Sequence, residues 1–514
     1  MSDKIIPIVR VERFFDCCDS DFEKHLRESV AIWERFPEIE ARIAADQNSH
    51  GEAKKLLRKT DEQYESNRSE PMSFYSDLEP LERTGCELKR TGSPRMPPFI
   101  VYIYAMAYGW LGSIHSRNAR TVLQESLSIR SYLDSFDMDM PGISTIDENV
   151  KAISSTTLEL MLRRQLAYIC DCELDDFDKM YIDSTAVEGN SLWPTESGLI
   201  LDSLERAVRL AGSLGKFGLE SPSTGWLDKW LAEIREQHVA ICFAKGNKGA
   251  DKLRKRCYKR IYEISDKAVA RLIEGLEAKE AEHQAAIASM RPSLANRAKA
   301  ILEEIAENAM AAAKIAEYSF QRIELGKRIE TKDKILSLSD DSAYMISKAG
   351  RSPIIGYKPQ VIRSGMGFVS GIVLEPGNPS DSGQLVESIQ AGIDNTGKTP
   401  RMVIVDDGYS SREGLGQAQS ELNIETVSIS GAKGRELLGE ELWNDPEHVE
   451  ARKNRSAVES TIYTLKKNHG FGRMGRRGLT SVRWEMDMKI LAYNLDQILR
   501  VRRSQEEGRK RKAA

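Results

Sequence analysis

The first third of the chain has the apolar spacing of helices and lacks the strict alternation of half-buried strands. Residues 99–111 are strongly apolar, and residues 119–133 continue with helical spacing. No comparable strand pattern occurs before residue 173. We therefore expect residues 1–172 to form an all-α domain.

A break at residues 141–145 interrupts this helical region. Thr145 and Glu148 then make a capping-box pattern, which predicts a helix that runs from there to about residue 168. Short helices separated by such turns are compatible with a helix-turn-helix DNA reader. They are equally compatible with a plain helical bundle, and their spacing does not separate the two.

A single strand is predicted at residues 179–184, after which the pattern becomes helical from about residue 195. Residues 227–325 are rich in Ala, Glu, Lys and Arg with long helical spacing, broken by the turn at 246–249 and by Pro292. This stretch predicts a helical hairpin or coiled-coil insertion. It is either a solvated spacer or an arm that follows DNA or dimerises.

After residue 334 the period changes to that of strands alternating with helices. Strands are predicted at residues 334–338, 354–362, 367–374, 401–405 and 425–429, and helices at 384–393, 411–422, 455–467 and 484–499. The turn at 364–367 makes a hairpin of the second and third strands. The order predicts an α/β domain with a mixed sheet, whose first strand is separated from the others by the insertion.

The pattern thus divides the chain into five segments. These are residues 1–172, helical; 173–204, the first part of the α/β domain; 205–333, the helical insertion; 334–500, the rest of the α/β domain; and 501–514, a basic tail. A length of 514 residues is sufficient for two or three domains with cores of their own.

Composition narrows the class of protein. With 40% hydrophobic and 30% charged residues, and no apolar run as long as a membrane span, the sequence predicts a cytoplasmic protein that does not enter a membrane. None of the seven cysteines forms a Cys-x2-Cys pair, so reduced thiols are expected and a zinc site is not.

Basic residues are clustered even though the net charge is −4. Residues 452–483 contain nine Lys or Arg and one acid, Glu459, and residues 245–260 contain eight and one acid, Asp251. A further basic run begins at Arg500. Such clusters on an acidic background suggest defined phosphate-binding surfaces, although a solvated helix face explains the last run equally well.

Three acidic residues are placed where a two-metal phosphoryl-transfer enzyme needs carboxylates. Asp183 ends the apolar run 180–182, Asp406 ends the run 402–405, and Glu459 lies in a predicted helix that is otherwise basic. Carboxylates that converge on one sheet edge bind hard cations, and Mg²⁺ is the natural candidate. Each acid alone is weak evidence, because an acid at a strand end is usually a turn or cap residue.

The helix that carries Glu459 adds to this pattern. Arg455 and Glu459 share a helix face, and Lys466 lies two turns further along it. Ordinary ion pairing explains the first two residues. It does not explain why the rest of this helix is basic, whereas a helix that offers one carboxylate to metals and cations to phosphates explains both features.

Several segments together resemble the bacterial insertion-sequence transposases of the DDE class. They are Tyr181-Ile-Asp183 with the following Ser-Thr-Ala-Val-Glu188-Gly-Asn190, Trp193-Pro-Thr-Glu-Ser-Gly-Leu199, Gly356-Tyr-Lys358, Pro376-Gly-Asn-Pro-Ser-Asp381, Asp406-Asp-Gly-Tyr409, and Arg455-x3-Glu459-x6-Lys466. The resemblance covers roughly residues 90–500. It implies a ribonuclease H-like catalytic fold.

In that family the three acids form the metal-binding triad, which the resemblance assigns to Asp183, Asp406 and Glu459 with two Mg²⁺ ions, or Mn²⁺ as a substitute. Asp406 matches the motif better than Asp407, because it ends the strand directly. The resemblance also implies that Arg455 and Lys466 contact phosphates of the transposon ends.

Further candidates for DNA contact are Lys358, Tyr409, Lys467, Arg473 and His469, although a lone histidine such as His469 is more often structural. The chain departs from the family pattern at two positions. Arg452 stands where a tyrosine is common, and Glu196 stands where relatives usually carry aspartate.

The resemblance implies an enzyme that binds the terminal inverted repeats of its mobile element through residues 1–172. It would cleave the 3′ ends and join them to target DNA, as a homodimer on double-stranded DNA in the bacterial nucleoid. The alternatives are a catalytically inactive, transposase-derived repressor, and a helical protein that does not bind DNA.

Overall fold

The computed structural model describes residues 21–66, 96–110, 116–135, 139–191, 195–222, 225–244, 249–347 and 352–513. The chain folds into two compact units. The first contains residues 1–50, 94–190 and 342–514, and the second contains residues 51–93 and 191–341. None of the described helices is both long and apolar enough to cross a membrane.

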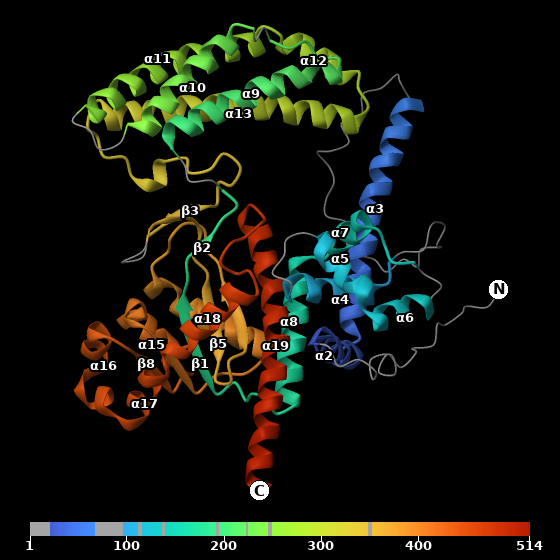
Figure 1. The fold of residues 1–514 in the computed structure, drawn as a ribbon, viewed down its shortest axis with the longest axis vertical. Helices are drawn as coiled ribbons and strands as arrows, with labels where there is room; N and C mark the ends of the chain where they lie inside the picture. The colour runs from blue at the N-terminus through green and yellow to red at the C-terminus, as the bar shows by residue number, and fades with distance from the viewer. Residues whose placement is uncertain are drawn as a thin grey trace, which may run out of the picture. The chain divides into compact units, whose positions relative to one another are not determined.

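The N-terminal part of the first unit is helical, as predicted (Figure 1). Its helices are α2 (Asp21–Arg35), α3 (Glu38–Ser66), α4 (Pro98–Trp110), α5 (Ser116–Glu125), α6 (Leu127–Ser135), α7 (Ile143–Lys151) and α8 (Ser155–Asp171). Residues 51–66 of α3 belong to the second unit. Helices α2, α4 and α8 pack against the C-terminal helix α19 (Leu479–Ala513), which continues through the basic tail.

Two helix boundaries in this region differ from the prediction. The predicted capping box is wrong, because Thr145 lies inside α7 and the N-cap is Gly142, whose residue type has no capping side chain. The helix predicted to reach residue 168 is two helices. Ser154 caps α8 by accepting a hydrogen bond from the Thr157 N–H, and Asp46 binds both the Ser154 N–H and its hydroxyl, so tertiary contacts fix the break.

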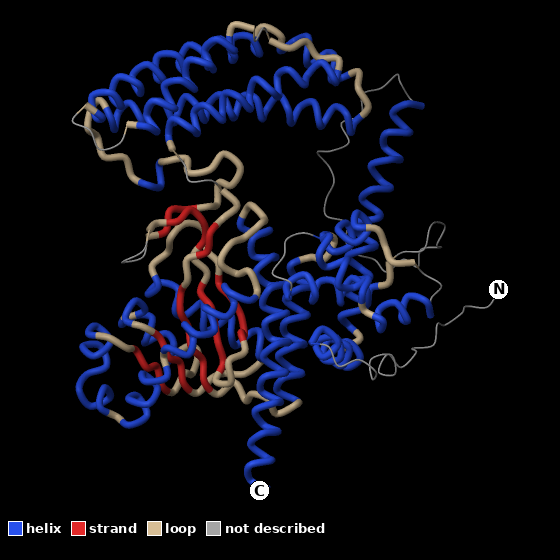
Figure 2. Tube along the Cα trace, in the orientation of Figure 1, coloured by secondary structure: helices blue, strands red, loops and turns tan. Residues whose placement is uncertain are grey.

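The α/β part contains a five-stranded mixed sheet, which confirms the predicted sheet type (Figure 2). Its strands in order are β6 (Val369–Val373), β5 (Gln360–Ser364), β1 (Lys179–Ser184), β7 (Met402–Val405) and β8 (Thr426–Ile429). Strands β6, β5 and β1 are antiparallel neighbours, whereas β1, β7 and β8 are parallel.

A helix covers each face of this sheet. On one face Met180 and Ile182 of β1 belong to a buried cluster with Leu385 and Ile389 of α14 (Leu385–Thr396). Side chains alternate along a strand, so Tyr181 and Asp183 belong to the other face. That face is covered by α18 (Ser456–Asn468), which contacts both β1 and β5.

A small second sheet follows β1 and was not predicted. It contains β2 (Val187–Glu188), β4 (Ile354–Tyr357) and β3 (Tyr344–Ile346), in that order. Gly356 of β4 approaches β2 so closely that a Cβ there would lie 1.9 Å from the carbonyl oxygen of Val187. Only glycine is compatible with this pairing.

Two of the strand predictions are wrong. Residues 334–338 form no strand, because Ile335 and Leu338 pack instead against the core of the helical unit. The single strand predicted over 354–362 is interrupted at Lys358 and Pro359, so that its halves β4 and β5 join different sheets.

The remaining helices of the first unit are α15 (Arg412–Ser420), α16 (Ala432–Asn444), α17 (Pro446–Asn454) and α18. Helices α16 and α17 were not predicted. Gly439 inside α16 has a left-handed φ of 76°, and Pro446 opens α17 directly afterwards, so the glycine and proline signals resembled a loop.

The second unit is a bundle of helices, and residues 227–325, predicted to be helical, form four of them (Figure 1). Its helices are α9 (Glu196–Ser213), α10 (Leu227–Phe243), α11 (Ala250–Glu277), α12 (Glu280–Ala288) and α13 (Pro292–Ile323). Glu196 is bound through both carboxylate oxygens by Arg322 of α13, at 3.0 Å and 2.5 Å, so this position has a structural partner inside the bundle.

Asp487 on α19 makes the stability of the first unit depend on pH. Burial raises the pKa of its carboxyl to about 6, although the Arg483 guanidinium opposes the shift. A folded-state pKa above the unfolded value means that the stabilisation is complete below about pH 4 and is lost as pH rises through about 6. Between pH 4 and pH 7, we expect the free energy of unfolding of wild type to fall by about 2 to 3 kcal/mol relative to that of Asp487→Asn, as measured by urea unfolding.

The matched control is Glu506→Gln, which removes an exposed carboxylate from the same helix. The difference in free energy of unfolding between this control and wild type should stay constant over the same pH range. An equally constant difference between Asp487→Asn and wild type would contradict the raised pKa of Asp487.

Candidate active site

The structure brings Asp183 and Asp406 to neighbouring strand ends. In the parallel pairing of β1 with β7, Tyr181 lies opposite Ile404. Two residues further along the same register, Asp183 lies beside Asp406. Asp406 follows the last residue of β7 with an extended backbone, so the side-chain alternation of the strand continues through it.

Both aspartates belong to the face of the sheet that α18 covers. Val403 and Val405 lie in the apolar cluster on the α14 face, so Asp406, one residue after Val405, belongs to the opposite face. The same parity assigns Asp183 to that face. Both carboxyl groups are half-buried at the carboxyl ends of parallel strands, where ligands commonly bind in α/β sheets.

Asp407 is used differently from its neighbour. Its Oδ1 accepts a hydrogen bond of 2.9 Å from the Gly434 N–H at the start of α16. Asp406 instead accepts one of 2.9 Å from the Gly408 N–H in its own turn. Asp407 therefore anchors the start of α16, and Asp406 is the member of the pair that follows the end of β7 directly.

A third aspartate, Asp381, reaches the same area from the turn before α14. A Cβ on Gly408 would lie 3.0 Å from Asp406 Oδ1 and 3.2 Å from Asp381 Oδ2, so both carboxylates border this glycine. Lys358 Nζ lies 2.9 Å from Asp381 Oδ1 and donates a hydrogen bond of 2.9 Å to the carbonyl of Pro379.

Tyr409 lies fully buried beneath these carboxylates. Its hydroxyl donates a hydrogen bond to Gln360 Oε1, and the Gln360 amide donates one of 3.2 Å to Asp381. Burial raises the pKa of the Tyr409 phenol well above its usual value, and the negative charges of Asp381, Asp183 and Asp406 raise it further. The phenol is therefore a neutral hydrogen-bond donor that supports the acidic group from within.

Glu459 projects from the flank of α18. Its carboxylate is ion-paired with Arg455 one turn earlier, and its side chain is 52% exposed. Lys466 on the same flank donates a hydrogen bond of 2.6 Å to the carbonyl of Ala186, three residues after Asp183. Lys466 thus joins this flank to the segment that follows β1.

The acidic residues do not form a preassembled metal cage. In the part of the chain that the structure describes, no group of three His, Cys, Asp or Glu side chains is arranged to hold a metal ion. Asp183 and Asp406 lie together, whereas the Glu459 carboxylate is engaged by Arg455.

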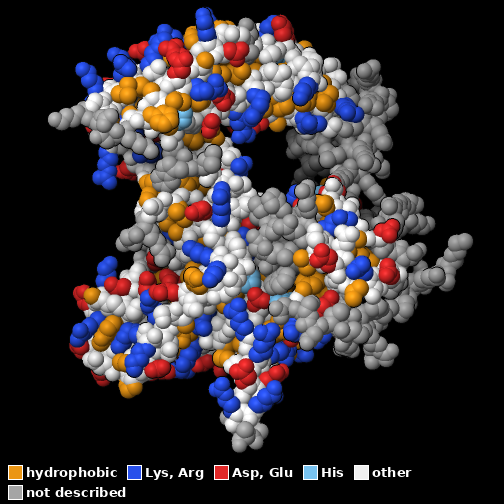
Figure 3. Space-filling model, viewed as in Figure 1, with side chains coloured by type: hydrophobic (Ala, Val, Ile, Leu, Met, Phe, Trp, Pro, Cys, Tyr) orange, Lys and Arg blue, Asp and Glu red, His pale blue; other side chains and the backbone are white. Residues whose placement is uncertain are grey.

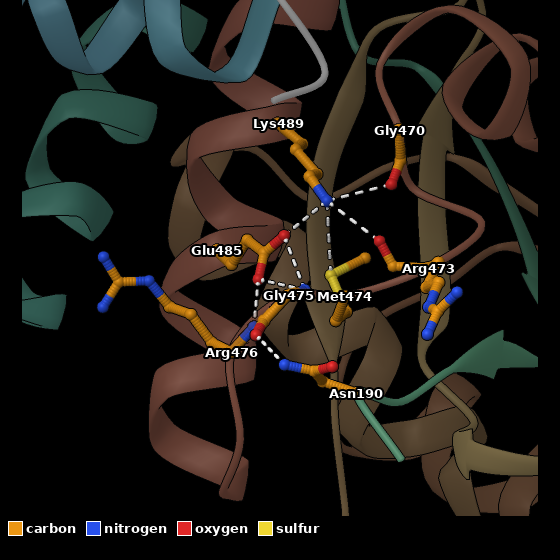
Figure 4. A network of polar contacts seen from close by, with 8 residues as sticks. All are labelled: Asn190, Gly470, Arg473, Met474, Gly475, Arg476, Glu485 and Lys489. Carbon is orange, nitrogen blue, oxygen red and sulfur yellow. Dashed lines mark hydrogen bonds and ion pairs between the residues drawn. The ribbon is translucent and has the colours of Figure 1, made fainter. Parts of the chain in front are cut away.

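The basic loop after α18 is fixed by a buried ion pair on α19 (Figure 4). Lys489 Nζ, 1% exposed, lies 2.6 Å from Glu485 Oε1, 0% exposed, and donates to the carbonyls of Gly470 and Arg473. Glu485 accepts hydrogen bonds of 2.9 Å from the N–H groups of Gly475 and Arg476.

The same loop is joined to the strand that follows β1. The Glu188 N–H donates to the carbonyl of Gly472, and the Met474 N–H donates to the carbonyl of Glu188. Asn190 donates a hydrogen bond of 2.7 Å to the carbonyl of Gly475 (Figure 4). The loop is thereby rigidly placed beside the end of β1, with the exposed side chains of Arg473 and Arg477 on it.

The predicted DNA-contact residues divide into exposed and buried ones. Lys467 and Arg473 are exposed, and Lys467 lies 5.5 Å from the ring of Tyr463. Lys358, Tyr409 and His469 have internal partners instead. The His469 ring is 1% exposed and lies 3.0 Å from Asp496.

Asp381 and Tyr463 were not predicted as site residues. Asp381 lies in the Pro-Gly-Asn-Pro-Ser-Asp turn before α14, and such a turn before a helix is a signal that could have marked it. Tyr463 is a 62% exposed aromatic residue one turn after Glu459. Its helical spacing from Glu459 and Lys467 is visible in the sequence, whereas its exposure follows only from the fold.

Residues 328–495 match the family model described as Transposase DDE domain. This third of the chain is a transposase DDE domain. Members of this family are DNA nucleases and strand-transfer enzymes, so the prediction of a DDE transposase enzyme is confirmed. No curated protein and no solved structure matched the chain.

The DDE domain match includes Asp406 and Glu459 and begins after the strand that carries Asp183. The family implies a ribonuclease H-like fold, DNA binding and the general use of divalent metal ions. An origin in a bacterial insertion sequence stays a prediction.

Proposed function

We propose that this chain is a DNA transposase that binds the terminal inverted repeats of its element, hydrolyses the phosphodiester at each 3′ end and transfers the freed 3′-hydroxyl to target DNA. The observation that carries the proposal is the alignment of Asp183 with Asp406 on the face of the sheet that α18 covers, in a chain with a transposase DDE domain.

The donor set suits a hard divalent cation. Asp183 and Asp406 offer carboxylate oxygens, the ligands that Mg²⁺ prefers, and Glu459 on the neighbouring flank of α18 completes the triad that the family implies. Two such ions, Mg²⁺ or Mn²⁺, supply an activated nucleophile and stabilise the leaving oxygen. The protein's own residues bind and position the DNA.

The Arg455–Glu459 ion pair gives DNA a way to complete the site. A phosphate group competes with the Glu459 carboxylate for the Arg455 guanidinium, because Arg binds both anions through its planar donors. When Arg455 binds a DNA phosphate, Glu459 is released toward the strand ends. Lys467, Arg473 and Tyr463 line the exposed surface next to it and contact the DNA, while Lys358 and Tyr409 hold Asp381 and Gln360 in place.

The test uses the purified full-length chain and duplex DNA that carries the element's ends, taken from the flanks of its gene. In Mg²⁺ or Mn²⁺ we expect strand cleavage that produces 3′-hydroxyl ends, and EDTA should abolish it while leaving retention of end DNA in a gel-shift assay. Binding without cleavage in either metal would overturn this function in favour of a transposase-derived repressor. Absence of binding would overturn both.

A further inference from the structure

The first half of α11 carries four exposed cations on one face of the helix. These residues, named here the cationic stripe, are Lys252, Lys255, Arg256 and Lys259. Their spacing of three, four and seven residues places them in one row along the helix. Figure 3 shows Lys and Arg side chains along the whole bundle, including the end at which α11 begins.

The stripe differs from the other cations of the same segment, which are neutralised locally. Arg254 lies 3.0 Å from Asp251 and donates a hydrogen bond to the carbonyl of Ala244. Arg260 lies 2.5 Å from Glu233 and 3.3 Å from Glu263. Among the residues that the structure describes, no acidic group pairs with any of the four stripe cations.

Helix stability does not account for this arrangement. Like charges three and four residues apart repel one another, and cations near a helix N-terminus oppose the helix dipole. The segment also contrasts with its surroundings. Outside residues 245–260, residues 191–341 contain seventeen Lys or Arg against twenty-two Asp or Glu. The positive charge of the unit is concentrated at one place.

The stripe suits a polyanion and does not suit a membrane. The apolar face of α11, with Cys257, Tyr258 and Ile261, is buried in the bundle, and the described part of α11 has no exposed large hydrophobic side chain. A helix that binds a membrane surface would need such an apolar face. An acidic protein surface would carry fewer regularly spaced charges than nucleic acid.

The dimensions of the stripe correspond to a nucleic-acid backbone. Seven residues of helix span about 10 Å, which corresponds to roughly three phosphates of one DNA strand. The stripe contains no aromatic or amide side chain, so it offers nothing that stacks on a base or reads a base edge.

We propose that the cationic stripe binds the phosphates of duplex DNA without regard to base sequence. Through the stripe, the helical insertion contributes to binding the DNA on which the DDE domain acts. The proposal rests on the proposed function only in taking this DNA as the substrate.

The experiment replaces the four stripe cations together, as Lys252→Gln, Lys255→Gln, Arg256→Gln and Lys259→Gln, in the full chain. Binding to end DNA and to a random duplex is measured between 50 and 200 mM salt. The slope of log K against log salt should become less steep by about two to four units, and affinity near 150 mM salt should fall at least about tenfold for both duplexes.

The matched control removes the same charge from exposed lysines elsewhere in the bundle, as Lys229→Gln, Lys299→Gln, Lys314→Gln and Lys327→Gln. Its slope should stay close to that of wild type, and circular dichroism should show both variants folded. Equal slopes for the stripe variant and wild type would overturn the proposal, as would an equal loss in the control.

Two further outcomes separate this proposal from the proposed function. A wild-type chain that cuts end DNA, together with a stripe variant of unchanged slope, would overturn the role of the stripe alone. A change of oligomeric state in sedimentation with unchanged DNA binding would assign the stripe to contact between copies and also overturn it. A wild-type chain that does not bind DNA would overturn both proposals.

Discussion

Replacing Asp183 or Asp406 by Asn is expected to lower metal-dependent cleavage of end DNA by on the order of 10³-fold. The two residues lie at the neighbouring ends of β1 and β7, and both carboxylates act on the pKa of Tyr409. The amide removes the negative charge that a divalent cation needs while keeping the size of the side chain. Cleavage is measured under single-turnover conditions in Mg²⁺, and binding of end DNA by gel shift.

Asp407→Asn is the matched control for this loss. It makes the same replacement of one carboxylate oxygen by an NH2 group at an adjacent residue, and the remaining amide oxygen can still accept the hydrogen bond from Gly434. Its cleavage rate should remain within a few-fold of wild type. Retained cleavage in Asp406→Asn together with a loss in Asp407→Asn would reassign the site to Asp407.

Binding of end DNA should persist in all three variants, because the charges removed are negative. If Asp183→Asn or Asp406→Asn lost binding as well, the defect would lie in the fold or in the DNA surface. The two aspartates would then no longer be assigned to catalysis.

Breaking the buried Glu485–Lys489 pair is expected to lower the free energy of unfolding by about 3 to 5 kcal/mol. Lys489→Met leaves the Glu485 carboxylate buried without its cation, and it leaves the carbonyls of Gly470 and Arg473 without a donor. Glu485→Gln leaves the Lys489 ammonium buried without its anion. Urea unfolding of each variant measures the loss.

The double variant Glu485→Gln/Lys489→Met distinguishes an ion pair from general packing. It removes both charges while the amide oxygen still accepts from the N–H groups of Gly475 and Arg476. We therefore expect the double variant to be more stable than either single variant. A loss equal to the sum of the two single losses would refute the buried-pair explanation.

Arg435→Met offers a surface comparison, since it breaks an exposed ion pair with Glu440 in α16. It should change stability little, because solvent screens such pairs. The Glu485–Lys489 and Arg435–Glu440 pairs should therefore differ in their effect on stability because only the first is buried.

The strands that hold the aspartates were predictable because each contains a short apolar run, residues 180–182 in β1 and residues 402–405 in β7. The residues 179–184 predicted as a strand are those of β1, and β7 differs from the prediction by one residue. A buried strand in the middle of a sheet needs such runs, so sequence and structure agree there. The helical spacing of Arg455, Glu459 and Lys466 was likewise a local property.

The partners of the site residues could not be predicted, because they depend on tertiary contacts. Lys358 resembles a free cation in the sequence, but Asp381 from a distant turn binds it. Tyr409 resembles a surface residue in a polar motif, but it is buried against Gln360. Glu485 and Lys489 are spaced like any exposed helix pair, and only the fold reveals their burial.

The small sheet after β1 determines how the helical insertion is attached. The chain leaves the catalytic unit just after β2 and returns just before β3, and both strands pair with β4. The hydrogen bonds of this sheet hold the two ends of the insertion together, so its 151 residues close a loop whose entropy depends only weakly on length. We therefore expect that the inserted helices can be shortened, lengthened or exchanged without a change in the register of Asp183.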